Sequence, residues 1–217
     1  MIKIIGNGPS LNTIDKSKLF NNLFPSVSYN RAYIIYETYN FYPTYYFCID
    51  KAVLLNCLPD IKKLLNSPIQ YFILLECNET LDLLKHEKIT LIQKNNDNKY
   101  YFGDVATFSI YYLYQNGFQN FDIYGCDCNY IEDYQKLNVD LEFNTKDPAR
   151  KIILKPKKGS KDPNHFLDNY FDESTEYSVP RTQNHLSCWK YLFKIKNLHL
   201  LFKTKTILQK IQSPFLS

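Results

Sequence analysis

The sequence lacks the segments that carry a chain into or across a membrane. No apolar run approaches the roughly 20 residues that are needed to span a bilayer. The N-terminus has no basic region followed by an apolar stretch and a small-residue cleavage site. We therefore expect a cytoplasmic protein. Peripheral contact with the inner membrane surface stays open.

The sequence also lacks the patterns of metal-binding, disulfide-linked and nucleic-acid-binding proteins. None of its six cysteines forms a Cys-x-x-Cys pair or lies near a histidine at zinc-ligand spacing. We therefore expect free thiols and no metal or other cofactor. The formal net charge of +4, from 26 basic and 22 acidic residues, is too weak a bias to indicate nucleic acid. Anionic small molecules remain candidate ligands.

The length and the apolar pattern predict one α/β domain over residues 1–217. Short β-prone runs alternate with stretches of helical length. The runs cover residues 2–5, 26–29, 44–49, 69–75, 89–92, 121–124 and 198–202. This alternation favours a Rossmann-like, mostly parallel sheet that is flanked by helices.

Helices are predicted over residues 104–116, 181–196 and 206–212. Asp104 is the expected N-cap of the first, and Gly117 is its expected end. After Gly125 the chain is polar and shows no sustained apolar period until about residue 177. A loop of this length inside a domain is typically a functional lid or partly disordered. We predict a lid or acceptor-binding insertion over residues 126–180.

A glycine-rich turn follows the first predicted strand. Its sequence is Gly6-Asn7-Gly8-Pro9-Ser10. Two glycines let the backbone approach a ligand closely, and the helix start that follows offers N–H groups to a phosphate. The turn is not a dinucleotide fingerprint, because Leu11 holds the third glycine position, and it lacks the Gly-Lys-Ser/Thr of a P-loop. A tight turn without a ligand is the alternative.

Polar residues stand at the ends of several predicted strands. They are Asn7, Asn30, Asp50 and Asp127. In open parallel sheets the ligand crevice lies outside the carboxyl ends of the strands, so these side chains are candidate ligand contacts. Turn formation or helix capping is the alternative for each of them.

The turn from Gly6 to Ser10, the strand-end residues, the block 104–127 and His165 resemble, in order and spacing, the bacterial sialyltransferases of glycosyltransferase family 42. The resemblance covers most of the chain. It implies a CMP-activated sialic acid or related acidic sugar as donor and a glycan as acceptor. It also implies inverting, metal-independent transfer with a histidine as general base, in lipopolysaccharide or capsule biosynthesis. Pterin diphosphokinase-like proteins share the Gly-x-Gly-Pro-Ser turn and the Gly-x-Asp strand end.

The resemblance assigns a role to each matching residue. It places Asn7, Gly8, Pro9 and Ser10 at the nucleotide phosphates, Asn30 and Asp50 near the cytidine and the donor sugar, and Gly125 and Asp127 at the ribose and base. His165 falls at the position of the family's base, and Tyr130 and Tyr134 correspond to tyrosines that steady the leaving phosphate. The family opens its central helix with Thr-Ser-Gly, whereas this chain has Asp104-Val105-Ala106.

The chemistry of the side chains leaves other assignments open. His165 lies in a polar segment that suits a general base, and His185, on a predicted helix, is the next candidate although a structural role is more usual there. Glu132 and Asp133, with Asp127, could hold Mg²⁺, but clustered acids are usually only solvated. The alternative functions are an ATP- and Mg²⁺-dependent diphosphokinase and a non-catalytic nucleotide-binding module. Homo-oligomerisation stays open.

The C-terminal third combines aromatic and aliphatic residues with lysines between residues 189 and 205. Such a surface suits an anionic membrane leaflet. We expect instead that the apolar residues form core and that the lysines are its solvated edge.

Overall fold

Seven parallel strands form the main sheet of the computed structural model. The structure describes residues 1–95, 103–131, 139–143, 152–156, 163–167, 170, 177–178 and 182–212. The strands are β1 (Ile2–Ile5), β2 (Ser26–Tyr29), β3 (Tyr45–Cys48), β4 (Tyr71–Leu75), β5 (Ile89–Ile92), β6 (Asn120–Tyr124) and β10 (His199–Phe202). Each of the seven predicted runs forms one of these strands. The predicted Rossmann-like α/β fold is confirmed.

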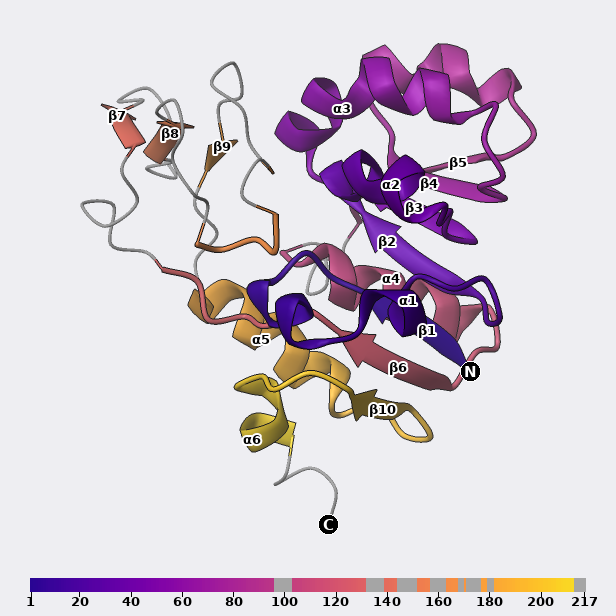
Figure 1. The fold of residues 1–217 in the computed structure, drawn as a ribbon. Coiled ribbons are helices and arrows are strands. Elements are labelled where there is room, and N and C mark those ends of the chain that lie inside the picture. The colour runs from indigo at the N-terminus through magenta and orange to yellow at the C-terminus, as the bar shows by residue number, and fades with distance from the viewer. Residues whose placement is uncertain are drawn as a thin grey trace.

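The strand order places β1 at a reversal of the chain's direction through the sheet. The order is β10-β6-β1-β2-β3-β4-β5, so the chain builds outward from β1 to β5 and then crosses to the other side of β1 (Figure 1). Ile4 pairs with Val27 of β2 on one side and with Ile123 of β6 on the other. In open parallel sheets such a switch point opens a crevice at the carboxyl ends of the strands. A ligand site is therefore expected at the carboxyl ends of β1 and β6.

Helices cover both faces of the sheet. On one face lie α4 (Val105–Gln115), α5 (Thr182–Leu192) and α6 (Leu208–Gln212). On the other lie η1 (Pro9–Thr13), α1 (Lys16–Leu19), η2 (Asn30–Ile35), α2 (Tyr36–Tyr39), α3 (Lys51–Leu64) and η3 (Asn78–Lys85). Because side chains alternate along a strand, Ile4 packs with the first group and Ile5 with the second. Both faces are buried, and the strands are accordingly rich in apolar residues.

The predicted ends of α4 are confirmed. Asp104 Oδ1 accepts hydrogen bonds from the backbone N–H groups of Ala106 (2.7 Å) and Thr107 (3.2 Å), as an N-cap does. Gly117 follows the helix with a φ of +91°, which glycine adopts without strain.

A second, antiparallel sheet lies within the predicted insertion. Its strands are β7 (Val139–Phe143), β8 (Ile152–Pro156) and β9 (Tyr177–Ser178), in the order β7-β8-β9. Figure 1 shows them on the side of the main sheet where its strands end. The expectation that this stretch lacks regular structure is wrong for these residues. The alternation of apolar and acidic residues over Val139–Phe143 is the strand signal that was passed over.

The apolar residues near the C-terminus are mainly core. Trp189 and Leu192 of α5 are fully buried, and Phe202 of β10 is also buried. Tyr191 and Leu201 remain exposed. No helix in the described part of the chain is both long and apolar enough to cross a membrane.

Candidate functional site

Glycines at the ends of β1 and β6 let the two strand ends approach each other closely. The Gly8 N–H donates to the Gly125 carbonyl at 2.8 Å, and the Gly6 N–H donates to the Tyr124 carbonyl at 2.8 Å. A Cβ atom at Gly6 would overlap the Gly125 carbonyl, and one at Gly8 would lie 2.6 Å from the same oxygen. Gly125 itself has a φ of +63°. The glycines of the predicted turn are thus needed for contact between backbones.

Asp127, which follows β6, binds the turn after β1. Its Oδ2 atom accepts the backbone N–H of Ser10 at 2.8 Å, and its Oδ1 atom accepts the Ser10 hydroxyl. Burial raises the pKa of Asp127, and the two hydrogen bonds from Ser10 oppose this only in part. The N–H groups of Gly8 and Ser10 are therefore both engaged inside the protein. A phosphate would reach the Ser10 N–H only if Asp127 moved.

Two asparagines at the ends of neighbouring strands, Asn7 and Asn30, each have a buried side-chain oxygen that can accept hydrogen bonds. Asn7, after β1, donates from Nδ2 to the Tyr170 hydroxyl oxygen at 2.8 Å and to the Tyr29 carbonyl at 3.3 Å. Among the residues that the structure describes, the buried Oδ1 atoms of Asn7 and Asn30 have no hydrogen-bond partner. Asn30, after β2, has a φ of +52°. Buried acceptors are normally paired, so these two oxygens are available to accept hydrogen bonds from a ligand.

The segment that contains His165 closes over the same turn. The Phe166 N–H donates to the Asn7 carbonyl at 2.9 Å, and Asn12 Nδ2 donates to the Phe166 carbonyl at 3.2 Å. The His165 ring stacks on Tyr170 with centroids 3.8 Å apart. The structure thus places the segment of His165 against the turn from Gly6 to Ser10.

The other predicted residues differ in their surroundings. Asp50 lies after β3 but is exposed, and its carboxylate caps α3 by accepting the Val53 N–H at 3.1 Å. Pro9 is the first residue of η1. Tyr134 lies outside the described residues, as do Glu132 and Asp133.

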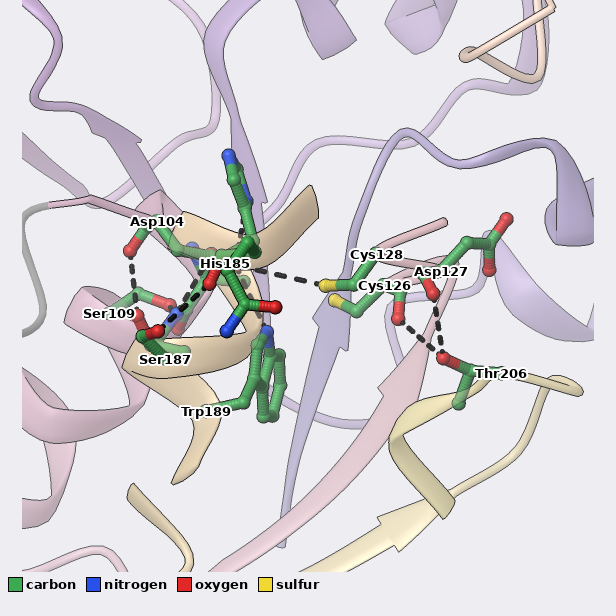
Figure 2. Close-up of polar contacts among 12 residues, drawn as sticks. Asp104, Ser109, Cys126, Asp127, Cys128, His185, Ser187, Trp189 and Thr206 are labelled. Atoms are coloured by element: carbon green, nitrogen blue, oxygen red, sulfur yellow. Dashed lines mark hydrogen bonds and ion pairs between the residues drawn. The ribbon is translucent and has the colours of Figure 1, made fainter. Parts of the chain in front are cut away.

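A second polar cluster, centred on Asp104, lies beside this site (Figure 2). Asp104 Oδ2 is 3.0 Å from His185 Nδ1 and also 3.0 Å from Trp189 Nε1, which donates to it. The Cys128 thiol is 3.9 Å from the same oxygen. Burial alone would raise the pKa of Asp104. The hydrogen bond of His185 and the charge that its ring carries when protonated, together with the N–H groups at the start of α4, lower it below its usual value.

Tyr130 borders this cluster, and Tyr29 links the turn to α4. The Tyr130 ring meets the His185 ring edge-on, with centroids 4.9 Å apart. Burial raises the pKa of Tyr130 well above its usual value, and nearby Cys128 and Asp104 add to this effect. The Tyr29 hydroxyl is hydrogen-bonded to Ser109 of α4 at 3.1 Å, while the Tyr29 carbonyl accepts from Asn7. The Asn7 side chain and the middle of α4 are therefore joined through Tyr29.

Asp104, Cys128 and His185 are residue types that bind metal ions, and their candidate ligand atoms lie within 4.8 Å of one another. Here His185 and Trp189 both approach the same carboxylate oxygen. Burial raises the pKa of Cys128 well above its usual value, so its thiol is neutral. The cluster has the geometry of a hydrogen-bonded carboxylate–imidazole pair. The sequence alone does not reveal this pair, because Asp104 and His185 lie 81 positions apart.

The comparisons with known proteins give a partial likeness of fold. No protein-family model matches the sequence, and no curated protein matches it. Among solved structures, the chain is similar to the sialyltransferase CstII from Campylobacter jejuni in complex with the substrate analogue CMP-3FNeuAc, with 17% sequence identity and a TM-score of 0.42. The match covers 58% of this chain and 63% of that chain, less than two thirds of either.

Proposed function

We propose that the chain is a glycosyltransferase that takes a sugar from a nucleotide-activated donor at the carboxyl ends of β1, β2 and β6. The buried, unpaired Oδ1 atoms of Asn7 and Asn30 carry this proposal, since among the described residues nothing pairs with them. Ribose hydroxyls, the cytosine amine and sugar hydroxyls are the donor groups that such oxygens accept. Their place next to the β1–β6 switch point is the usual place for a nucleotide in a parallel sheet.

The identity of the nucleotide rests on the motif residues. The turn from Gly6 to Ser10 with Asn30 and Asp127 resembles the CMP-sugar sialyltransferases, which favours CMP and an acidic sugar. In this assignment Asn7 and Asn30 accept from the cytidine and the donor sugar. Asp127 accepts from the ribose hydroxyls, as a carboxylate beside a switch point commonly does. Gly8, Pro9, Ser10 and Gly125 form the wall behind the nucleotide, and Asp50 borders the sugar.

The transfer itself needs a proton acceptor and an in-line arrangement of donor and acceptor. Attack of the glycan hydroxyl on the anomeric carbon, opposite the departing phosphate, inverts that carbon. Two histidines are candidates for this role: His185, whose ring contacts Tyr130, and His165, whose ring stacks on Tyr170. Holding the two substrates in line supplies a large part of the rate. We propose neither a metal nor another cofactor for this step.

Binding experiments separate this function from its alternatives. CMP should raise the melting temperature in the presence of EDTA, by an amount that grows with ligand concentration. UMP and ATP should raise it less. Stabilisation only by ATP with Mg²⁺ would favour a diphosphokinase instead. CMP binding without turnover of any CMP-sugar would favour a non-catalytic module.

A further inference from the structure

The Asp104–His185 pair has the geometry of a proton-transfer pair. His185 Nδ1 is 3.0 Å from Asp104 Oδ2, and Asp104 is only 5% exposed. The other carboxylate oxygen accepts two N–H groups of α4, so the carboxylate is held in one orientation. We propose that His185 accepts the proton of the attacking hydroxyl and that Asp104 is its positioning residue. This assignment rests on the glycosyltransferase function proposed above.

The hydrogen bond between His185 and Asp104 determines which nitrogen of the His185 ring can accept a proton. A carboxylate can only accept, so in the neutral imidazole Nδ1 carries the hydrogen and Nε2 carries the lone pair. The two nitrogens lie on opposite sides of the ring, so Nε2 points away from Asp104. Among the described residues nothing hydrogen-bonds to Nε2, and 16% of the His185 side chain is exposed. Nε2 is therefore the nitrogen to which a substrate hydroxyl would give its proton.

Among the described residues, Asp104 is the charged group that contacts His185. The other titratable groups near the pair in this part of the chain are Tyr29 of β2, the residues Cys126, Cys128 and Tyr130, which follow β6, and Cys188 on α5. Burial raises the pKa of each, to about 11 for Cys188, so all five are neutral near pH 7. The carboxylate can thus stabilise the imidazolium that forms when the ring takes a proton. Trp189 Nε1 donates to the same oxygen and fixes it further.

His165 has a different setting. Its ring lies flat on Tyr170, with an angle of 6° between the planes, and Tyr170 accepts from Asn7. Its neighbour Phe166 binds the backbone of the turn. These contacts suit a residue that closes over the donor. We therefore assign donor binding to His165 and proton transfer to His185.

The step balances without a further reactant. The acceptor oxygen gives its proton to His185 Nε2 and forms a bond to the anomeric carbon of the donor sugar. The bond from that carbon to the phosphate oxygen breaks, and its electron pair leaves with CMP. The imidazolium then releases its proton to solvent, and the ring is neutral again.

The variant His185→Asn separates proton transfer from a structural role. The asparagine Nδ2 atom takes the place of the imidazole Nδ1 and can still donate to Asp104, but nothing replaces Nε2. Turnover is followed as CMP release from CMP-N-acetylneuraminate, with water or lactose as acceptor, in EDTA. We expect His185→Asn to lose roughly 10²–10⁴-fold in kcat. Its melting temperature and its affinity for CMP should stay near those of the unchanged protein.

Control measurements separate proton transfer by His185 from a role of His165 or of a metal ion in this step. The unchanged enzyme should lose activity as the pH falls, and the residual rate of His185→Asn should lack this limb. Asp104→Asn, which keeps an N-cap, should lower kcat and leave KM unchanged. His199→Asn, on β10 away from the site, should behave as the unchanged enzyme does.

Near-normal turnover of His185→Asn, loss in a His165→Asn variant alone, or loss of activity in EDTA would each overturn the assignment. If the unchanged protein still binds CMP and releases CMP from the donor, with or without EDTA, the proposed function stands. The absence of both would refute that function and this assignment with it.

Discussion

Ser10 donates its backbone N–H and its hydroxyl to the two carboxylate oxygens of Asp127, across the adjacent ends of β1 and β6. The carboxylate therefore occupies the place at the turn where the sequence predicts a phosphate. This changes the expected role of the turn. It holds an acidic side chain beside the switch point, and that side chain can accept hydrogen bonds from a ribose.

Asp127→Asn tests this role. The asparagine oxygen can still accept the Ser10 N–H, so the fold should persist. Loss of a charge-assisted hydrogen bond to the ribose should weaken CMP binding by roughly 10- to 100-fold. The unchanged protein should bind CMP more tightly than 2′-deoxy-CMP in calorimetry, and Asp127→Asn should bind the two almost equally. If both proteins prefer CMP over 2′-deoxy-CMP to the same extent, Asp127 does not bind the ribose.

Asn30→Gly tests the unpaired oxygens. Asn30 has a φ of +52°, which glycine adopts freely, so deletion of its side chain should leave the backbone in place. We expect CMP affinity to fall about tenfold, the value of one hydrogen bond to a buried acceptor. The melting temperature without ligand should change little, because the removed oxygen had no partner in the described part of the chain. Unchanged CMP affinity would contradict a ligand contact at Asn30.

Gly8→Ala tests the close approach of the two strand ends. The added Cβ would lie 2.5 Å from Asp127 Oδ2 and 2.6 Å from the Gly125 carbonyl. The clash is within the protein, so we expect the free energy of unfolding to fall by about 1–3 kcal/mol even without a ligand. Pro9→Ala, one residue further on, is the matched control. Urea unfolding of the two variants measures the difference, and equal stability would contradict this packing.

The fold follows from the sequence where local signals are strong. Most strands of the main sheet are rich in apolar residues and have turn residues beside them, and Asp104 and Gly117 mark the ends of α4. The strands β7 and β8 were missed because polar segments surround them. Asn7, Asn30, Asp127 and His165, which the sequence indicates as candidates, lie at one edge of the sheet. The engagement of Ser10 by Asp127, and of His185 by Asp104, depends on contacts between residues far apart in the chain, which one sequence does not reveal.

The stability of the protein in acid should depend on Asp104. Its folded pKa lies below its ordinary value of 3.8, so its contribution to stability is present above that value and is lost as the pH falls through the folded pKa. Asp104→Asn should therefore be less stable than the unchanged protein at pH 7, and the difference should shrink in strong acid. Urea unfolding between pH 7 and pH 2 checks this. A difference that does not depend on pH would mean that the charge of Asp104 contributes little.

The most direct test of the proposed glycosyl transfer is proton NMR of a CMP-N-acetylneuraminate reaction in EDTA, with lactose as acceptor. The method follows CMP release and the anomeric configuration of the first sugar product in one experiment. We predict release of CMP, a first product of inverted configuration, and loss of both signals in His185→Asn. A retained configuration, or no cleavage by a protein that ATP and Mg²⁺ alone stabilise, would contradict the account.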